Sequence, residues 1–122
     1  MLLFALILAP AAVSSLSEIH QRDIACVAEI ALLADAQKRG VEGGTDVRFT
    51  GRRWAGIVGD RIVFETGQPR ELVAFAMQEA AQTNRTDGQN DTQRDDCIRQ
   101  MLRELTAADA AGQPLPKPVP AK

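Results

Sequence analysis

The sequence predicts a small all-α protein, a bundle of about four helices in the mature chain that is held together by one disulfide. Apolar residues recur at three- and four-residue intervals in several segments, which is typical of amphipathic helices. Two cysteines, Cys26 and Cys97, fall in separate segments of this kind, and aromatic residues make up only 4% of the chain. The scarcity of aromatic residues disfavours an aromatic-rich β-sandwich. A chain of 122 residues has the length of one domain at most.

The first fifteen residues predict a secretory signal peptide. Residues 1–13 contain no charged side chain, and the densest apolar run of the chain lies among them, followed by small residues. This run is shorter than the roughly 20 apolar residues that a membrane span needs. The alternative is a buried N-terminal helix of a cytosolic protein. We expect a signal peptide at 1–15, a single helical domain at 16–106 and a disordered, Pro- and Ala-rich tail at 107–122.

The two cysteines predict an exported protein with a Cys26–Cys97 disulfide. They lie too far apart in the sequence for a CxxC redox motif or a zinc knuckle, and an even cysteine count is typical of oxidising compartments. Arginine strongly outnumbers lysine, which is typical of GC-rich bacterial genes. Together these features indicate a secreted protein, and the periplasm as its compartment. The alternative is a lipoprotein acylated at Cys26, but Asp23 stands where that motif has leucine.

The segment 16–39 predicts the first helix. Ser15 and Glu18 have the spacing of a capping box at its start, and Lys38 and Arg39 precede a glycine at its end. The glycine-rich segment 40–45 predicts a loop. The apolar stripe of this helix consists of Ile19, Cys26, Ile30 and Leu33.

The segment 46–66 allows two interpretations. As a helix, it places Trp54, Val58 and Ile62 on one line and ends at a glycine. As strands, it forms a hairpin at residues 53–65 with a turn at Gly59-Asp60, which would make the fold α+β. We favour the helix, because an isolated hairpin is marginally stable and the segments around this one are helical.

Two further helices are predicted, from Arg70 to about Gln82 and from about Thr92 to Thr106, with a polar loop at 83–91 between them. Both cysteines lie on apolar helix faces, so a disulfide would join the first helix of the mature chain to the last. The predicted core faces consist of Leu72, Val73, Ala76, Met77 and Ala80 in the third helix and Cys97, Ile98, Met101, Leu102 and Leu105 in the fourth.

One basic cluster, Arg48, Arg52 and Arg53, lies beside Trp54. Guanidinium groups that share a helix face bind phosphate, carboxylate or an anionic membrane surface, and a tryptophan beside them can contact a ligand or partner. These four residues are the candidate anion or partner contacts. The alternatives are a solvated face of ion pairs for the arginines and a buried core position for Trp54. Small residues nearby recur at every fourth position and would let another helix approach closely: Gly51, Ala55 and Gly59.

The sequence contains no catalytic constellation, and we expect no metal site and no cofactor. The single histidine, His20, has no evident partner and is interpreted as a surface residue near a helix start. Four aspartates between residues 87 and 96 lack the spacing of a calcium loop. Carboxylates there favour the start of a helix without a metal ion. The net charge of −2 argues against electrostatic binding of nucleic acid.

In plan, the chain resembles the small acid-stress chaperones of the bacterial periplasm, which are short, helical and tied by one disulfide between distant helices. The resemblance is one of architecture and assigns no site residue. It implies a non-catalytic binding or chaperone-type role, with a protein partner or unfolded clients and no stable membrane span after signal cleavage. One alternative is an adaptor subunit that docks through Trp54 and the small residues. Another is a small envelope enzyme or enzyme inhibitor, which a polar cleft around Trp54, Arg61 and Glu65 would support.

Overall fold

The computed structural model describes residues 16–87 and 91–112, and these form four helices. They are α2 (Glu18–Lys38), α3 (Thr50–Thr66), α4 (Arg70–Asp87) and α5 (Asp91–Gly112). No strand occurs in the described ranges, so the all-α prediction is confirmed and the hairpin alternative is wrong. The signal peptide predicted at 1–15 and the last part of the predicted tail, 113–122, lie outside the described residues.

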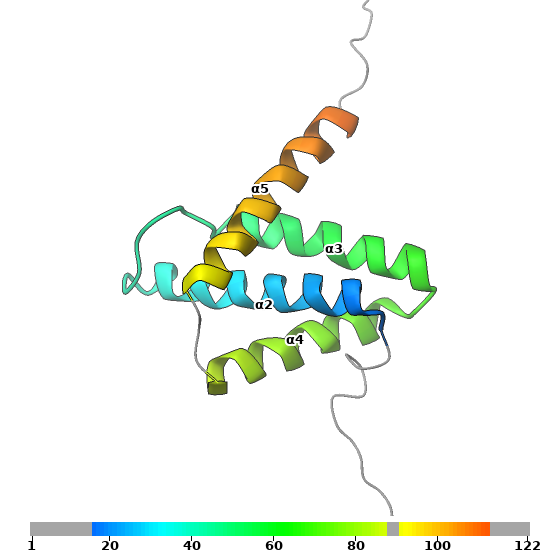
Figure 1. Cartoon of the computed structure of the whole chain (residues 1–122), viewed down its shortest axis with the longest axis horizontal. Coiled ribbons are helices and arrows are strands. Elements are labelled where there is room, and N and C mark those ends of the chain that lie inside the picture. The colour runs from blue at the N-terminus through cyan, green and yellow to red at the C-terminus, as the bar shows by residue number, and fades with distance from the viewer. Residues whose placement is uncertain (1–15, 88–90, 113–122) are drawn as a thin grey trace, which may run out of the picture.

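Helix α2 is the centre of the bundle, because it contacts each of the other three helices (Figure 1). In the view of Figure 1, α3 lies above α2 and α4 below it, α3 runs antiparallel to α2, and α3 and α4 also contact each other. Helix α5 crosses α2 and α3 obliquely. The predicted disulfide is confirmed: Cys26 of α2 and Cys97 of α5 are bonded, with their Cα atoms 5.2 Å apart. In the described residues no helix is long and apolar enough to cross a membrane.

Helix α3 forms because its apolar residues have a helical and not an alternating arrangement. Trp54, Val58 and Ile62 each have an exposed fraction of 0% and lie on one face, as the helical interpretation predicted. A hairpin would have divided these residues between two strands, and they would not form the continuous stripe along one helix that is observed. The helix ends at Gly67, which has a φ of 74° and whose N–H donates to the carbonyl oxygen of Val63. Glycine adopts this left-handed conformation without steric cost.

The small residues of α3 are used inside the fold. A Cβ atom on Gly51 would lie 2.8 Å from Cγ2 of Ile30, so the absence of a side chain allows α2 to approach closely. A Cβ on Gly59 would lie 3.8 Å from Cε of Met77 in α4. The predicted close approach of a helix is therefore made by helices of the same chain.

The helix boundaries differ from the prediction in three places. The N-cap of α2 is Ser17, whose hydroxyl accepts a hydrogen bond from the backbone N–H of His20, and not Ser15. Helix α4 continues to Asp87 through residues predicted as loop, where Asn84 donates a hydrogen bond to Glu29 of α2. Helix α5 continues to Gly112, past its predicted end and into the segment predicted as tail, because the alanine-rich residues there favour a helix.

The core is a single cluster contributed by all four helices, by Leu16 just before α2 and by Val47 of the connecting loop. Two predicted stripe residues are exceptions: Ile19 is 63% exposed and Leu102 is 42% exposed. Helix α5 packs through a narrower face than predicted, formed by Cys97, Met101 and Leu105 at successive fourth positions. A helix that crosses its neighbours obliquely buries a narrow stripe, and Leu102 lies outside it.

Candidate functional site

A groove of about 700 Å³ lies between the C-terminal half of α2 and the start of α3, and we call it the α2–α3 groove. Its walls include Phe49 and several charged residues from the end of α2, the connecting loop and the first turn of α3. The volume lies within the roughly 300–1,000 Å³ of small-molecule sites. The apolar residues that line it are mostly small: Val27, Ala31, Ala34, Gly51 and Ala55.

The loop that forms one wall of the groove is fixed by the side chain of Gln37. Its Nε2 donates to the carbonyl oxygens of Gly43, at 3.1 Å, and Thr45, at 2.7 Å. Its Oε1 accepts from the backbone N–H of Val47 at 2.9 Å, and Val47 is fully buried. These anchors hold the chain just before Phe49, which lines the groove while remaining 70% exposed. The wall is therefore a preformed part of the fold.

Both acidic residues in the groove are neutralised by arginines. The carboxylate of Asp46 accepts hydrogen bonds from the backbone N–H and the guanidinium of Arg48, each at 3.0 Å. These bonds lower the pKa of Asp46 to about 2. Asp35 accepts from Nε of Arg39 at 3.1 Å.

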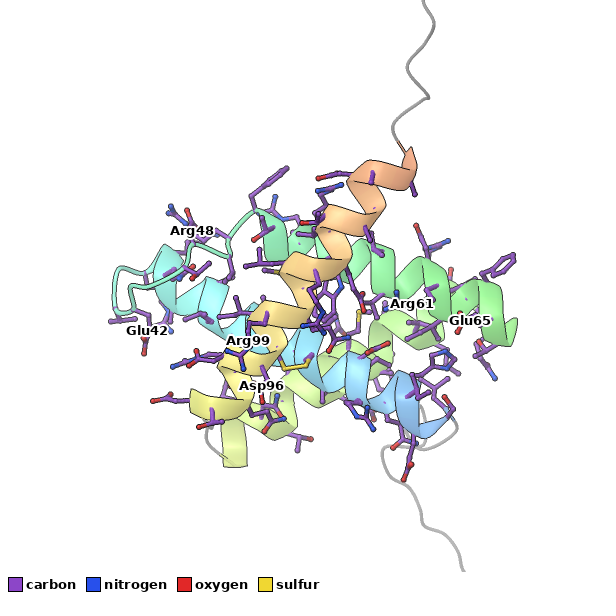
Figure 2. All side chains as sticks on the ribbon, turned by 45° about the horizontal axis from the view of Figure 1, so that its top comes forward. Glu42, Arg48, Arg61, Glu65, Asp96 and Arg99 are labelled. Carbon is purple, nitrogen blue, oxygen red and sulfur yellow. A yellow bond between two sulfur atoms is a disulfide. The ribbon has the colours of Figure 1, made fainter. Side chains whose placement is uncertain are left out.

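Arg48 lies at the loop end of the α2–α3 pair, at the opposite end from Arg61 and Glu65 (Figure 2).

Two cations in the groove have no such partner. Lys38 and Arg52 are exposed and line the groove. Neither side chain forms an ion pair or hydrogen bond with any residue that the structure describes. After the two acid–arginine pairs are counted, the groove therefore has an excess of positive charge.

The structure divides the predicted contact cluster. Arg48 and Arg52 line the groove. Arg53 turns toward α5 and forms an ion pair with Asp109. Trp54 is fully buried and its Nε1 donates to Glu104 at 2.8 Å, so it lies in the core and offers no surface to a partner.

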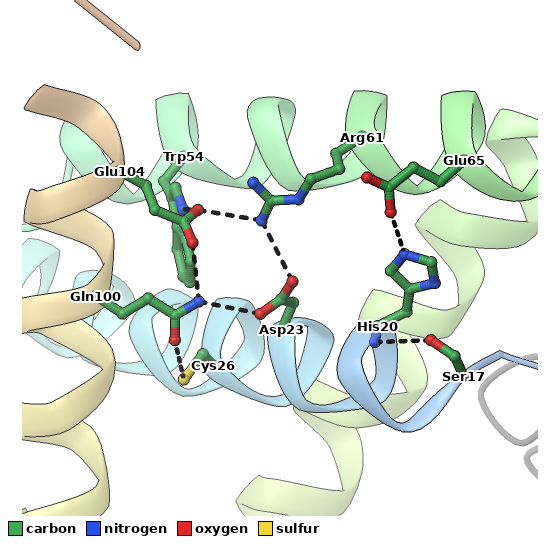
Figure 3. A network of polar contacts seen from close by, with 9 residues as sticks. All are labelled: Ser17, His20, Asp23, Cys26, Trp54, Arg61, Glu65, Gln100 and Glu104. Carbon is green, nitrogen blue, oxygen red and sulfur yellow. Dashed lines mark hydrogen bonds and ion pairs between the residues drawn. The ribbon is translucent and has the colours of Figure 1, made fainter. Parts of the chain in front are cut away.

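A polar network crosses the opposite end of the bundle, and we call its charged and amide members, Asp23, Arg61, Gln100 and Glu104, the Asp23 cluster (Figure 3). Arg61 donates to Asp23 at 3.3 Å and to Glu104 at 3.1 Å. Gln100 donates to Asp23 at 3.0 Å and to Glu104 at 3.1 Å. The cluster therefore links α2, α3 and α5 through side chains that satisfy one another.

The environment of Glu104 favours its ionised form. Partial burial acts to raise its pKa, but hydrogen bonds from Trp54, Gln100 and Arg61 and the charge of Arg61 outweigh that effect. The pKa of Glu104 is therefore lowered from its ordinary value of 4.5. Ionised Glu104 is the acceptor that connects the buried tryptophan to the rest of the cluster.

His20 is buried, and the prediction of a surface position is wrong. Its Nε2 lies 2.8 Å from Oε1 of Glu65, which α3 brings close to the start of α2. Its Nδ1 is buried without a hydrogen-bond partner among the described residues. Since one ring nitrogen contacts Glu65 and the other is buried, His20 presents no free nitrogen to a substrate. No local sequence pattern predicts this contact, because it joins residues in different helices.

A polar cleft of about 540 Å³ does lie over this region, lined by His20, Asp23, Arg61, Glu65 and Glu104 among others. Trp54 is not among its lining residues. The polar groups at its centre bond to one another, His20 to Glu65 and Arg61 to Asp23. Both cysteines of the chain are in the disulfide. This arrangement stabilises contacts between helices, and among the described residues that line the cleft no serine, threonine or cysteine stands beside His20.

Two of the three aspartates near the start of α5 form ion pairs within the helix. Asp91 pairs with Arg94, and Asp96 pairs with Arg99. Within the described ranges, no three His, Cys, Asp or Glu side chains are grouped so that they could hold a metal ion.

Lys38, Phe49 and Gln37 were not predicted as parts of one site. The sequence does carry one signal for it, since the loop predicted at 40–45 reverses the chain and so returns the start of α3 alongside the C-terminal half of α2. The anchoring role of Gln37 has no sequence signature.

Comparisons of the chain with protein-family models, with curated proteins and with solved structures find no match.

Proposed function

We propose that this chain is a non-catalytic binding protein of the bacterial cell envelope, whose α2–α3 groove takes an apolar ligand. The observation that carries the proposal is the groove itself, a small-molecule-sized hollow with an apolar lining and the largely exposed Phe49 at its wall. Single exposed apolar side chains are common on protein surfaces, and Phe64 is also exposed. Phe49 differs because its ring lines a hollow, where a ligand can cover it.

The rigidity of the surroundings supports a binding role. Gly51 packs tightly against Ile30 beneath the groove, and Gln37 holds its loop wall through three hydrogen bonds. A site that is already formed loses little conformational entropy when a ligand enters.

The proposal is tested by titrating the protein with N-phenyl-1-naphthylamine, a neutral fluorophore that brightens in apolar surroundings. We expect saturable binding, and we expect Ala31→Trp to weaken it at least about tenfold, because the new ring fills the groove. Ala74→Trp is the matched control, since Ala74 is also an exposed helical alanine but lies on α4, outside the groove. Equal binding by both variants, or no binding by the parent protein, contradicts the proposal.

Export to the periplasm is part of the proposal. The exclusively uncharged start of the chain and the cysteine pairing support it. The test is an intact mass with a thiol count on protein isolated from its native host. A chain shortened by about 15 residues with no free thiol is expected, and a full-length or lipid-modified chain contradicts it.

A second candidate function is an acid-responsive chaperone. The Asp23 cluster favours it, because Glu104 there joins α5 to α3 and loses its charge as the pH falls through its lowered pKa. We expect Trp54 fluorescence to shift at low pH and aggregation of an acid-sensitive client to decrease. A protein that neither loosens nor protects a client in acid is not a chaperone of this kind.

A further inference from the structure

We infer that the ligand of the α2–α3 groove is a free long-chain carboxylate, bound with its anionic group between Lys38 and Arg52. This inference rests on the proposed function of the groove and adds the chemical class of its ligand.

The charge distribution along the groove carries the inference. Helix α3 begins beside the middle of α2, where Gly51 packs against Ile30, and Lys38 lies about two turns further along α2 toward the connecting loop. The two uncompensated cations, Lys38 and Arg52, therefore flank the part of the groove that Ala31 and Ala34 line. Val27 and Ala55 lie beyond Arg52, on the side away from the connecting loop. The uncompensated positive charge of the groove therefore lies toward the loop, and the lining beyond it is apolar.

The neighbouring charges do not cancel this asymmetry. Asp35 and Asp46, the acidic residues that line the groove, are each held by an arginine. The start of α3 adds the partial positive charge of a helix N-terminus, and no acidic residue occupies its first turn. An anion placed between Lys38 and Arg52 would meet attraction from both side chains and from the helix.

The size of the groove favours a small amphiphile over a protein. Its lining comes only from the C-terminal half of α2, the connecting loop and the start of α3. Stable protein interfaces use about 20–30 residues on each side, whereas a hollow of about 700 Å³ has the size of a small-molecule site. A single alkyl chain also fits a lining of alanine and glycine, which gives a narrow and smooth apolar surface.

The test compares decanoate with 1-decanol by isothermal titration calorimetry at about pH 8, below the concentrations at which either aggregates. The two probes share one alkyl chain and differ in charge. We expect decanoate to bind at least about tenfold more tightly than decanol. We expect Lys38→Gln and Arg52→Gln each to weaken decanoate binding about fivefold and to leave decanol binding unchanged. Arg22→Gln, which removes another exposed arginine outside the groove, is the matched control.

The outcomes separate this inference from the proposed function. If decanoate and decanol bind with equal affinity and both lose binding in Ala31→Trp, the groove is an apolar site, and the inference that its ligand is a carboxylate is overturned. Failure of both probes, together with failure of the neutral fluorophore, would overturn the groove itself. Two further arms test other occupants. Binding only to an acidic amphipathic peptide, or only to phosphatidylglycerol vesicles, would also overturn the inference, because the anion would then belong to a protein or to a membrane surface.

Discussion

The two ends of the α2–α3 pair use charge in opposite ways. At one end, the Asp23 cluster matches each of its charged groups with a partner from another helix and joins three helices in doing so. At the other end, the α2–α3 groove holds charges that are paired only within short stretches of chain, and Lys38 and Arg52 have no partner among the described residues. Charged groups that satisfy one another stabilise a fold, whereas charges left over beside an apolar hollow are available to a ligand. The Asp23 cluster therefore resembles a structural network, and the α2–α3 groove resembles a ligand-binding site.

Removing the disulfide is expected to have the largest effect, because it anchors α5 beside the Asp23 cluster. The double variant Cys26→Ser, Cys97→Ser should lower the free energy of unfolding by about 4 kcal/mol, since the bridge closes a long loop in the unfolded chain. Chemical denaturation followed by Trp54 fluorescence measures the change. A loss below about 1 kcal/mol would mean that the cluster alone holds α5 in place.

The next largest effect is expected for Glu104→Gln. The glutamine keeps the shape and one acceptor oxygen but removes the charge that Trp54 and Arg61 contact, so we expect a loss of about 1–2 kcal/mol in unfolding free energy. The control is Asp96→Asn, which breaks an exposed ion pair with Arg99 on α5 and should change stability by less than about 0.5 kcal/mol. Equal losses in the two variants would remove the distinction between the cluster and an ordinary surface ion pair.

The same glutamate gives the cluster a defined pH dependence. Because its folded pKa is lowered from 4.5, ionised Glu104 contributes stability that is fully present above about pH 4.5 and is lost as the pH falls through the folded pKa. Glu29 acts in the opposite direction, since burial raises its pKa and its protonation in acid favours the fold. Glu104→Gln should therefore flatten the acid limb of the stability curve, which denaturation at a series of pH values would show.

A smaller effect is expected beneath the groove. Gly51→Ala places a Cβ atom 2.8 Å from Cγ2 of the buried Ile30, and the resulting overpacking should cost about 1 kcal/mol after the gain in helix propensity is included. Gly56→Ala is the matched control, because nothing lies within 4 Å of its new Cβ, and it should stabilise the protein by up to about 1 kcal/mol. Thermal unfolding of the two variants in parallel distinguishes them. Stabilisation by Gly51→Ala would show that α2 and α3 are less tightly packed than the structure indicates.

The smallest effect on stability is expected at the groove rim. Lys38→Gln and Arg52→Gln should each leave the unfolding free energy within about 0.5 kcal/mol of the parent value, because neither residue contributes an ion pair to the described fold. A larger loss would show that these cations serve the fold, and the contrast between the two ends would then disappear.

Most of the fold could be predicted from the sequence because it depends on local patterns. The spacing of Trp54, Val58 and Ile62 predicted a helix, and the cysteines on two apolar faces predicted the bridge. The helix ends were predicted less well, since Asn84 extends α4 through a contact with Glu29 that only the folded chain creates.

The candidate site could be predicted only in part. Arg48 and Arg52 belong to a visible basic cluster, and the structure places both at the groove. The separation of Arg53 from them, and the burial of His20 against Glu65, depend on which helix faces which. A single sequence carries no direct information on those orientations.

The Cys26–Cys97 bridge also bears on how the chain matures. Two cysteines allow only one intrachain pairing, so the oxidative folding of these residues has no incorrect isomer that must be reshuffled. An oxidant in its disulfide form, which takes up the two electrons and two protons of the thiols, can complete the reaction alone, and a disulfide isomerase is not required for a monomer of this chain. The only incorrect disulfides that this chain can form are between two molecules. The yield of correctly oxidised monomer should therefore depend on protein concentration more than on the time allowed for rearrangement.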